Sequence, residues 1–460
     1  MNNLFEWFSS GLKLKRWFLL LLVGVGLVST SIAMFVSSDK LDIKELIMYG
    51  IFFVIGFSAV IMSYVMSQKR ILQAIAEANA NPNGRNINLK KLLFDKKMLD
   101  KNTKVVVIGD GDGLAAILKG LKAFSNNITA VVNVIGTSGD TGIPLQIEDV
   151  KKAMIALSNK EEVLEDFFST KVRDGVLTGR KQGDVFFDML GRTCDGNLSK
   201  TIEYMSKILA IRGSVLPVTL DTVAVGAVLE DGTRAIGRKN ITEVVENRET
   251  KIERVFLSPS RCVPAEDVIM SIKEADVIII GPGSLYMGII PTLLIREVSD
   301  AIRKSNATKI YVSNIMTEKN QTDGYALSDC INAICEHAGK GLFDYCIFSD
   351  SDIMPEYVRR ANQDGVDLIE LDKSNIKGIR LVVDDLSVVD EKGNIRHNPL
   401  KLAQNIFKIF CDNMDLENSD KAIEYYTTKS KLKKMTGKNK KKSILFRDIK
   451  IVSGKKKKRK

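Results

Sequence analysis

The sequence predicts an α/β fold, namely a Rossmann-like, doubly wound and mostly parallel sheet, preceded by two transmembrane helices and followed by a basic tail. Three observations predict it. Two uncharged apolar runs lie near the N-terminus, and β-branched runs then alternate with helix-period stretches. Sixteen of the 67 Lys and Arg residues follow residue 428. We therefore divide the chain into a membrane hairpin (1–78), a linker (79–101), an α/β domain (102–415) and a tail (416–460).

The two apolar runs cover residues 17–36 and 46–68, and each is long enough to cross a bilayer core of about 30 Å. A cleaved signal peptide would have a shorter apolar core, and buried core helices of this length would carry more charge. Basic residues such as Arg16 and Lys69 flank the outer ends, whereas the loop between the runs has no net positive charge. The positive-inside rule then predicts a two-span protein of the cell membrane, with both termini and the main domain in the cytoplasm.

The strongest functional signal is a glycine-rich turn that follows a β-branched run over 105–108. The turn consists of Gly109, Asp110, Gly111, Asp112 and Gly113, and Leu114 opens the helix-period stretch behind it. A second β-branched run covers 128–135, which completes a βαβ unit. Such turns bind phosphate groups, because glycine lets the backbone approach a ligand and the next helix offers its N-terminal amides.

Strand-like and helix-like stretches alternate beyond this unit. Helical spacing covers 151–170, 198–210 and 328–337, and extended runs cover 215–229, 254–257, 277–280, 309–314, 345–349 and 366–371. Alternation on this scale predicts a mostly parallel sheet with helices on its faces.

The run over 277–280 ends at a second glycine loop. In this loop Gly281 and Gly283 flank a proline, Ser284 offers a hydroxyl, and Tyr286 offers an aromatic face. Loops at the carboxyl ends of adjacent parallel strands border one crevice. We therefore expect both glycine loops to face the same ligand.

Several classes of site are disfavoured by composition. The six cysteines show no C-x-x-C pairing, which predicts reduced core residues rather than disulfides or a zinc site. The only histidines are His337, expected near a helix C-terminus, and His397, expected to be structural just before a helix that opens at Pro399. A histidine-rich metal centre and a Ser–His–Asp triad are therefore not predicted.

The tail from residue 429 onward carries a charge of +15, whereas the whole chain carries +11. Three interpretations stay open: a solvated disordered end, a segment attracted to anionic membrane lipid, or a nucleic-acid contact. The membrane hairpin favours anionic lipid. The absence of an aromatic platform among the lysines argues against nucleic acid.

From about residue 104 to residue 402, the chain resembles the YvcK/CofD-like family of bacterial gluconeogenesis factors and related 2-phospho-L-lactate transferases. The matching segments are VVVIGDGDGL, NNITAVVNV, CDGNLSKTI, ILAIRGSVLPVTLDTVAVGAVLEDGT, EADVIIIGPGSLYMGIIPTLL, KIYVSNIMTEKNQTDGYALSD and GNIRHNPLKLAQ. The IRGSVLPVT and TDGYALSD segments are more similar to the gluconeogenesis-factor branch than to the transferases.

The resemblance implies a nucleotide-binding fold whose ligand, in this branch, is a UDP-sugar. It also implies a regulatory role linking carbon metabolism to cell-envelope synthesis and cell shape. The expected phosphate contacts are Gly109, Gly111, Gly113, Leu114, Gly281, Gly283 and Ser284, and the expected base, ribose or sugar contacts are Tyr286, Asn197 and Asp323. Two alternatives stay open: a transferase of the phospho-lactate type, and a membrane scaffold that binds no nucleotide but recruits envelope-synthesis proteins. A homo-oligomer also stays open.

The first loop departs from the family pattern, which usually reads GGGTGL. Here Asp110 and Asp112 stand in that loop. Two carboxylates beside a diphosphate repel it. They either face sugar or ribose hydroxyls, or share a bridging Mg²⁺ with the diphosphate, or weaken phosphate binding.

The family's acidic segment DDGGSSG is also altered, because residues 135–142 read IGTSGDTG. Ile135 and Gly136 replace the aspartate pair, whereas Thr137, Ser138 and Gly139 keep a polar, glycine-bearing loop as candidate ligand contacts. The histidine that usually precedes the Gly196–Asn197 pair is missing as well. If transferase chemistry needs those groups for a metal or an acceptor, this chain is predicted to bind rather than to catalyse.

Overall fold

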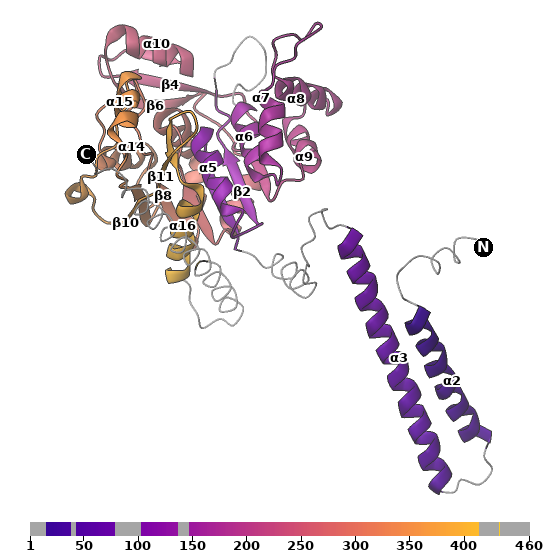
Figure 1. The fold of residues 1–460 in the computed structure, drawn as a ribbon. Helices are drawn as coiled ribbons and strands as arrows, with labels where there is room; N and C mark the ends of the chain where they lie inside the picture. The colour runs from indigo at the N-terminus through magenta and orange to yellow at the C-terminus, as the bar shows by residue number, and fades with distance from the viewer. Residues whose placement is uncertain (1–14, 38–42, 79–102, 137–146, 414–431, 433–460) are drawn as a thin grey trace, which may run out of the picture. The chain divides into compact units, whose positions relative to one another are not determined.

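The computed structural model describes residues 15–37, 43–78, 103–136, 147–413 and 432 (Figure 1). They belong to two compact units, formed by residues 1–101 and by residues 102–460. The expected linker, all but one residue of the expected tail, and the candidate contacts Thr137, Ser138 and Gly139 lie outside the described residues.

The first unit contains two long apolar helices, α2 (Lys15–Ser37) and α3 (Ile43–Ala78). By length and apolarity, the segments Leu20–Ser37 and Ile47–Met66 could each cross a membrane. The helices touch at Gly24 and Gly56, where a Cβ on either glycine would lie 2.9 Å from the carbonyl oxygen of the other. Such close contact through small residues is typical of paired membrane helices.

The second unit is built on a seven-stranded sheet. In spatial order its strands are β10 (Arg380–Asp384), β9 (Tyr345–Ser349), β8 (Thr308–Val312), β7 (Val277–Ile280), β1 (Val105–Gly109), β2 (Ile128–Val132) and β3 (Ser214–Pro217). Every pairing in it is parallel. The predicted Rossmann-like fold class is confirmed.

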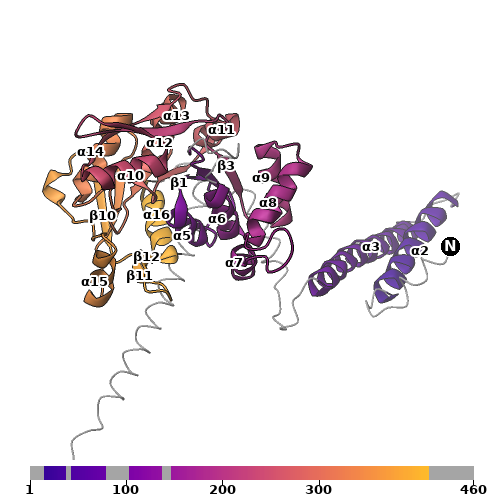
Figure 2. The same cartoon turned by 90° about the horizontal axis from the view of Figure 1, so that it is seen from above.

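Helices cover both faces of this sheet (Figure 2). One face carries α5 (Gly111–Leu121), α6 (Ile147–Leu157) and α16 (Pro399–Asn413), and the other carries α11 (Glu266–Glu274), α12 (Ile290–Leu294), α13 (Arg296–Lys304) and α14 (Leu327–Ala338). All residues of the central strands β1 and β7 are buried. Burial on both faces explains why these strands are continuous apolar runs rather than alternating ones.

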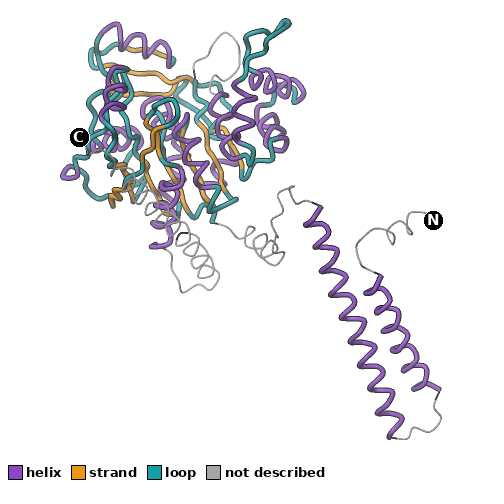
Figure 3. The backbone as a smooth tube through the Cα atoms, in the orientation of Figure 1, coloured by secondary structure: helices purple, strands orange, loops and turns teal. Residues whose placement is uncertain are grey.

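Smaller elements surround this core (Figure 3). They are α7 (Glu161–Ser169), α8 (Gln182–Thr193), α9 (Leu198–Ile208), an antiparallel sheet of β4 (Ala224–Leu229), β5 (Arg234–Ile236) and β6 (Ile252–Ser258), α10 (Arg238–Arg248), α15 (Pro355–Gln363), and a hairpin of β11 (Ser387–Val389) and β12 (Ile395–His397).

Three elements differ from the sequence prediction. The stretch 366–371 forms isolated bridges only, at Leu368 and Glu370, and the edge strand is β10 instead. The stretch 215–229 is divided between β3 and β4, which lie in different sheets. The stretch 151–170 is interrupted at residues 158–160, so that it forms the end of α6 and then α7.

Candidate functional site

The candidate site lies at the point where the strand order of the large sheet reverses. From β1, the sheet continues through β2 and β3 on one side and through β7 to β10 on the other. The register pairs Ile108 with Ile280, so the loops after β1 and β7 leave the sheet at the same level. Such a switch point at the carboxyl ends of parallel strands is where open α/β sheets bind ligands.

The two glycine loops are in direct contact. A Cβ at Gly109 would lie 2.9 Å from the carbonyl oxygen of Pro282, and one at Gly113 would lie 3.1 Å from the Pro282 ring. Glycine is therefore needed at both positions for the loops to approach so closely. The arrangement agrees with the expectation that the two loops border one crevice.

A cavity of about 630 Å³ opens beside these loops. It is lined by Asp110, Gly111, Asp112, Gly113, Ala116, Glu148, Asp149, Lys152, Arg238, Pro282, Gly283, Ser284, Asn314, Ile315, Met316, Thr317, Glu318, Ile395, Arg396 and His397. Its size lies within the range of small-molecule sites. The lining combines both loops with α6, α10, the segment after β8, and β12.

The amides of the second loop are already occupied by protein acceptors. The amides of Gly283, Ser284 and Leu285 donate to Asn314 Oδ1, Asp110 Oδ1 and Glu318 Oε2, at 3.1, 2.7 and 3.0 Å respectively. Asn314 also donates through Nδ2 to the Gly283 carbonyl at 2.8 Å. The second loop is thus held rigidly, but these three amides are not available for a phosphate.

Asp110 is turned into the protein rather than toward the crevice opening. Its side chain is buried, and its carboxylate occupies the space left by Gly283 and Gly288, where an added Cβ would collide with it. Arg238 Nη2 lies 3.8 Å from Asp110 Oδ2. Burial raises the pKa of Asp110 to about 6, although the charge of Arg238 acts to lower it. That Asp110 faces sugar or ribose hydroxyls, shares a cation with the diphosphate or weakens phosphate binding stays a prediction.

Glu318 is a second perturbed carboxyl group in the lining, and sequence reasoning missed it. Burial raises its pKa to about 7, and the nearby Asp110 raises it further, against hydrogen bonds from Leu285 N and Ser284 Oγ. Perturbed carboxyl groups of this kind cluster at functional sites. No local pattern around residue 318 marks it, because the groups that surround its carboxylate, in the second loop, Asp110 and Arg238, are distant in the sequence.

Asp112 behaves differently, because two cations hold it. Lys152 Nζ lies 2.6 Å from Asp112 Oδ1, and Arg396 Nη2 lies 2.9 Å from Oδ2. Burial alone would raise the pKa of Asp112, but the hydrogen bond and charge of Lys152, with the charge of Arg396, hold it below the usual value. No local sequence pattern predicts that either cation reaches Asp112.

The first loop leaves backbone donors open to the crevice. Gly111 has a φ of +61°, and a Cβ built there would meet nothing within 4 Å. Its amide donates to the Asp149 carboxylate. Among the described residues, no protein acceptor takes the amides of Asp112 and Gly113 at the start of α5. An anion at this position would find a helix N-terminus.

Other predicted contacts lie away from the cavity. Tyr286 is buried in the π-helix η1 (Leu285–Ile289), with its hydroxyl 2.8 Å from that of Tyr325. Asn197 caps α9 by accepting from Lys200 N at 3.0 Å. Core packing and helix capping therefore account for these side chains, and neither lines the cavity.

The remaining predicted positions support the loops or lie beside them. Leu114 is a buried core residue of α5, and Gly281 takes a φ of +78° in the second loop. Asp323 lies in a turn outside the cavity lining. His397 lines the cavity, but burial lowers its pKa to about 4, which keeps it neutral near pH 7. His337 lies in the last turn of α14 and accepts from Val255 N.

A preformed metal site is not visible in the described part of the chain, which holds no group of three or more His, Cys, Asp or Glu side chains suited to a metal. Asp110 accepts from the second loop, whereas Asp112 contacts two cations. That a cation bridges them to a diphosphate stays a prediction.

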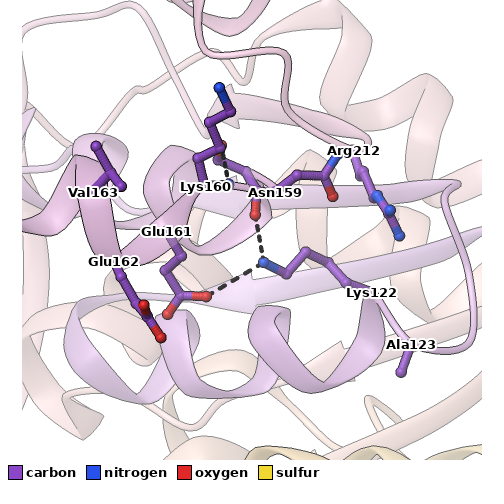
Figure 4. A pocket seen from close by; sticks show the side chains of 9 residues that line it. Lys122, Ala123, Asn159, Lys160, Glu161, Glu162, Val163 and Arg212 are labelled. Atoms are coloured by element: carbon purple, nitrogen blue, oxygen red, sulfur yellow. Dashed lines mark hydrogen bonds and ion pairs between the residues drawn. The ribbon is translucent and has the colours of Figure 1, made fainter. Parts of the chain in front are cut away.

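A larger cavity, of about 850 Å³, lies at the ends of α5 and α6 where β3 begins (Figure 4). Lys122 Nζ donates to the Ser158 carbonyl at 2.7 Å and lies 3.4 Å from Glu161 Oε2. This cavity is at the amino end of the strands and has no glycine loop in its lining. The switch-point cavity is therefore the candidate site.

The chain is similar to known proteins over most of its length. A family model described as 2-phospho-L-lactate transferase CofD matches residues 105–387. A "Putative gluconeogenesis factor" of Clostridium acetobutylicum is 32% identical over 440 residues, covering 93% of this chain and 96% of that protein. A "Gluconeogenesis factor" of Halalkalibacterium halodurans is 34% identical over 317 residues, covering 67% of this chain and 97% of that protein.

A solved structure shares the fold. The crystal structure of protein BH3568 from Bacillus halodurans superposes with a TM-score of 0.61 at 33% identity, covering 66% of this chain and 99% of that one. A second crystal structure of BH3568, which describes it as a member of the UPF0052 family, has a TM-score of 0.60.

Proposed function

Because the chain belongs to the 2-phospho-L-lactate transferase CofD family and has gluconeogenesis factors among its relatives, we propose that it is a membrane-anchored regulator that binds a nucleotide sugar. The ligand class is a UDP-sugar, and the regulated process is the balance between carbon metabolism and cell-envelope synthesis, including cell shape. The domain faces the cytoplasm in this proposal.

One observation carries the proposal: the two glycine loops meet at the switch point beside a cavity of about 630 Å³. The first loop presents Gly111 and the amides of Asp112 and Gly113 to that cavity, which suits the diphosphate of a nucleotide sugar. The second loop does not offer its own amides to a ligand, because protein side chains accept from them. One of these acceptors is Asp110 of the first loop, so the second loop holds the first in place.

Calorimetric titration of the full-length chain in detergent micelles tests this function. We expect saturable binding of a UDP-sugar, and no binding of the free sugar, because the diphosphate supplies the charge that the loop recognises. A nucleotide sugar with a different base serves as the control for base recognition. Absence of binding by every nucleotide sugar would leave the non-binding scaffold as the better account.

A transferase is the second candidate, favoured by the description of the family model that matches residues 105–387. Against it, Ile135 and Gly136 stand where the family carries an acidic pair. Prolonged incubation with a UDP-sugar and Mg²⁺ distinguishes the two. The regulator proposal predicts binding that persists in excess chelator and no turnover. Product formation that is lost in an Asp110→Asn/Asp112→Asn double variant would establish the transferase.

The partners of the other segments are proposals of the same kind. The basic tail suits the anionic lipid of the cytoplasmic membrane surface, with an attraction of about 1 kcal/mol per basic residue close to that surface. Envelope-synthesis proteins, and a second copy of the chain, are further candidate partners of the cytoplasmic domain.

A further inference from the structure

Two cations from separate elements converge on one carboxylate inside the candidate site. Lys152 lies on α6 and Arg396 on β12, and each contacts a different oxygen of Asp112, at 2.6 and 2.9 Å. All three side chains line the cavity. Two cations, one on each oxygen of a small anion, reproduce the contacts that proteins make with a phosphate group.

These ion pairs contribute little to folding stability. The side chains of Lys152, Asp112 and Arg396 are 37%, 46% and 43% exposed. Ion pairs at that exposure are screened by water and stabilise a protein by about 0–1 kcal/mol. A need for stability therefore does not explain why three elements place these groups together.

Arg238, the third cation in the cavity lining, has its contacts with buried groups of the protein. Arg238 donates to the Met287 carbonyl and faces the buried Asp110. It thus holds η1 and the second loop in place. Lys152 and Arg396 are the cations whose charged ends can turn toward a ligand, because their short contacts are with the exposed Asp112. Arg396 also lies 3.7 Å from Asp390 through Nε, which leaves its Nη2 end for a ligand once Asp112 is displaced.

We propose that Lys152 and Arg396 form the subsite for the ligand's phosphate groups, and that Asp112 occupies this subsite until the ligand displaces it. The inference rests on the proposed function, in that the crevice takes a phosphorylated ligand. It also explains the aspartate at a position where the family loop usually carries threonine. Asp112 lowers the affinity for phosphate by internal competition, so that only a ligand with further contacts binds well.

Pyrophosphate is the sharpest probe, because it carries the charge of the ligand without its base or sugar. Calorimetry on the full-length chain in micelles compares the wild type with Asp112→Asn. We expect the variant to bind pyrophosphate at least about tenfold more tightly, which corresponds to about 1.4 kcal/mol. Lys152→Met in the Asp112→Asn background should abolish this gain.

Glu165→Gln is the matched control. Glu165 also pairs with a lysine, Lys119 at 2.9 Å, and is similarly exposed, but it lies on α7 outside the cavity lining. Glu165→Gln changes the net charge by the same amount as Asp112→Asn. Because residue 165 lies outside the cavity, this control should bind pyrophosphate with the affinity of the wild type. Asp112→Thr provides a second variant if Asp112→Asn unfolds. Unchanged or weaker pyrophosphate binding after removal of the Asp112 carboxylate would overturn the proposal.

Titration of a UDP-sugar into the same variants separates this inference from the proposed function. If pyrophosphate responds as expected but no UDP-sugar binds, the subsite stands and the nucleotide-sugar function fails. If a UDP-sugar binds the wild type and its affinity is the same after Asp112→Asn, the function stands and the subsite is wrong.

Discussion

Asp110 and Glu318 approach the same short segment of backbone, and both keep a proton to an unusually high pH. Their pKa values are raised to about 6 and about 7, chiefly by burial. The folded protein therefore binds protons more tightly than the unfolded chain between their ordinary and raised pKa values. This contribution to stability is complete below about pH 4 and is lost as the pH rises through 6 to 7.

Glu318→Gln should remove part of that loss, because glutamine keeps an oxygen to accept from Leu285 N but cannot ionise. Between pH 6 and 8, the free energy of unfolding should fall by about 1.4 kcal/mol less in the variant than in the wild type. His397 titrates in the opposite direction, since burial lowers its pKa to about 4. That contribution is common to both proteins and cancels in the difference.

Urea denaturation at the two pH values measures this effect, with Glu162→Gln, an exposed position on α7, as the control. Parallel pH profiles for wild type and Glu318→Gln would show that the carboxyl group is already ionised in the folded state.

Gly288 leaves the space that the Asp110 carboxylate fills. Gly288→Ala should therefore destabilise the protein by about 1–3 kcal/mol through overpacking. The same substitution should cost less in an Asp110→Gly background, where the carboxylate is gone. A double-mutant cycle by chemical denaturation gives the coupling energy between the two sites. Additive effects would mean that the Asp110 carboxylate can move away from Gly288 without loss of folding free energy, which would contradict this contact.

The sequence located both glycine loops of the site, because glycine turns after apolar strands are local patterns. It could not place the surrounding charged groups. Lys152, Arg396 and Glu318 come from α6, β12 and the segment after β8, and only the tertiary fold brings them to one cavity. The direction of the Asp110 side chain was not predictable either, since the space it fills is left by Gly283 of the second loop and Gly288 of η1.

At the scale of elements, central strands were predictable and edge elements were not. The apolar runs that became β7 and β9 were predicted at their observed bounds, because burial on both faces leaves a continuous apolar signature. Strand β10 was missed since it is an edge strand whose residues are partly or fully exposed. The stretch 366–371 has a similar composition, but it pairs with other backbone only at Leu368 and Glu370 and so forms no strand.

The helical hairpin offers a matched pair of glycines for a test. A side chain at Gly56 would meet α2, whereas one at Gly50 on the same helix would meet nothing within 4 Å. Gly56→Ile should separate the helices and Gly50→Ile should not. The readout is disulfide cross-linking of Ser31→Cys with Tyr49→Cys, because Ser31 Oγ donates to the backbone carbonyl of Tyr49 at 2.7 Å. Equal cross-linking in both variants would contradict the close packing of α2 on α3.

At the scale of the whole molecule, the chain joins an apolar helical unit to an α/β unit. The basic residues at the outer ends of the hairpin predict that both termini lie in the cytoplasm. A reporter that is active only outside the cytoplasm, fused after Lys460, should be silent. The same reporter inserted at residue 40, in the loop between the spans, should be active. The reverse pattern would place the α/β unit outside the cell.

The central claim, that the cavity beside the glycine loops binds a nucleotide sugar, is tested most directly by titrating a UDP-sugar into wild type, Gly111→Val and Gly232→Val. Both glycines have positive φ and open space around the Cβ position, but only Gly111 lines the cavity. The two substitutions therefore impose the same kind of backbone strain. We predict that binding is lost in Gly111→Val and unchanged in Gly232→Val. Equal affinity of a folded Gly111→Val variant and the wild type would contradict the claim.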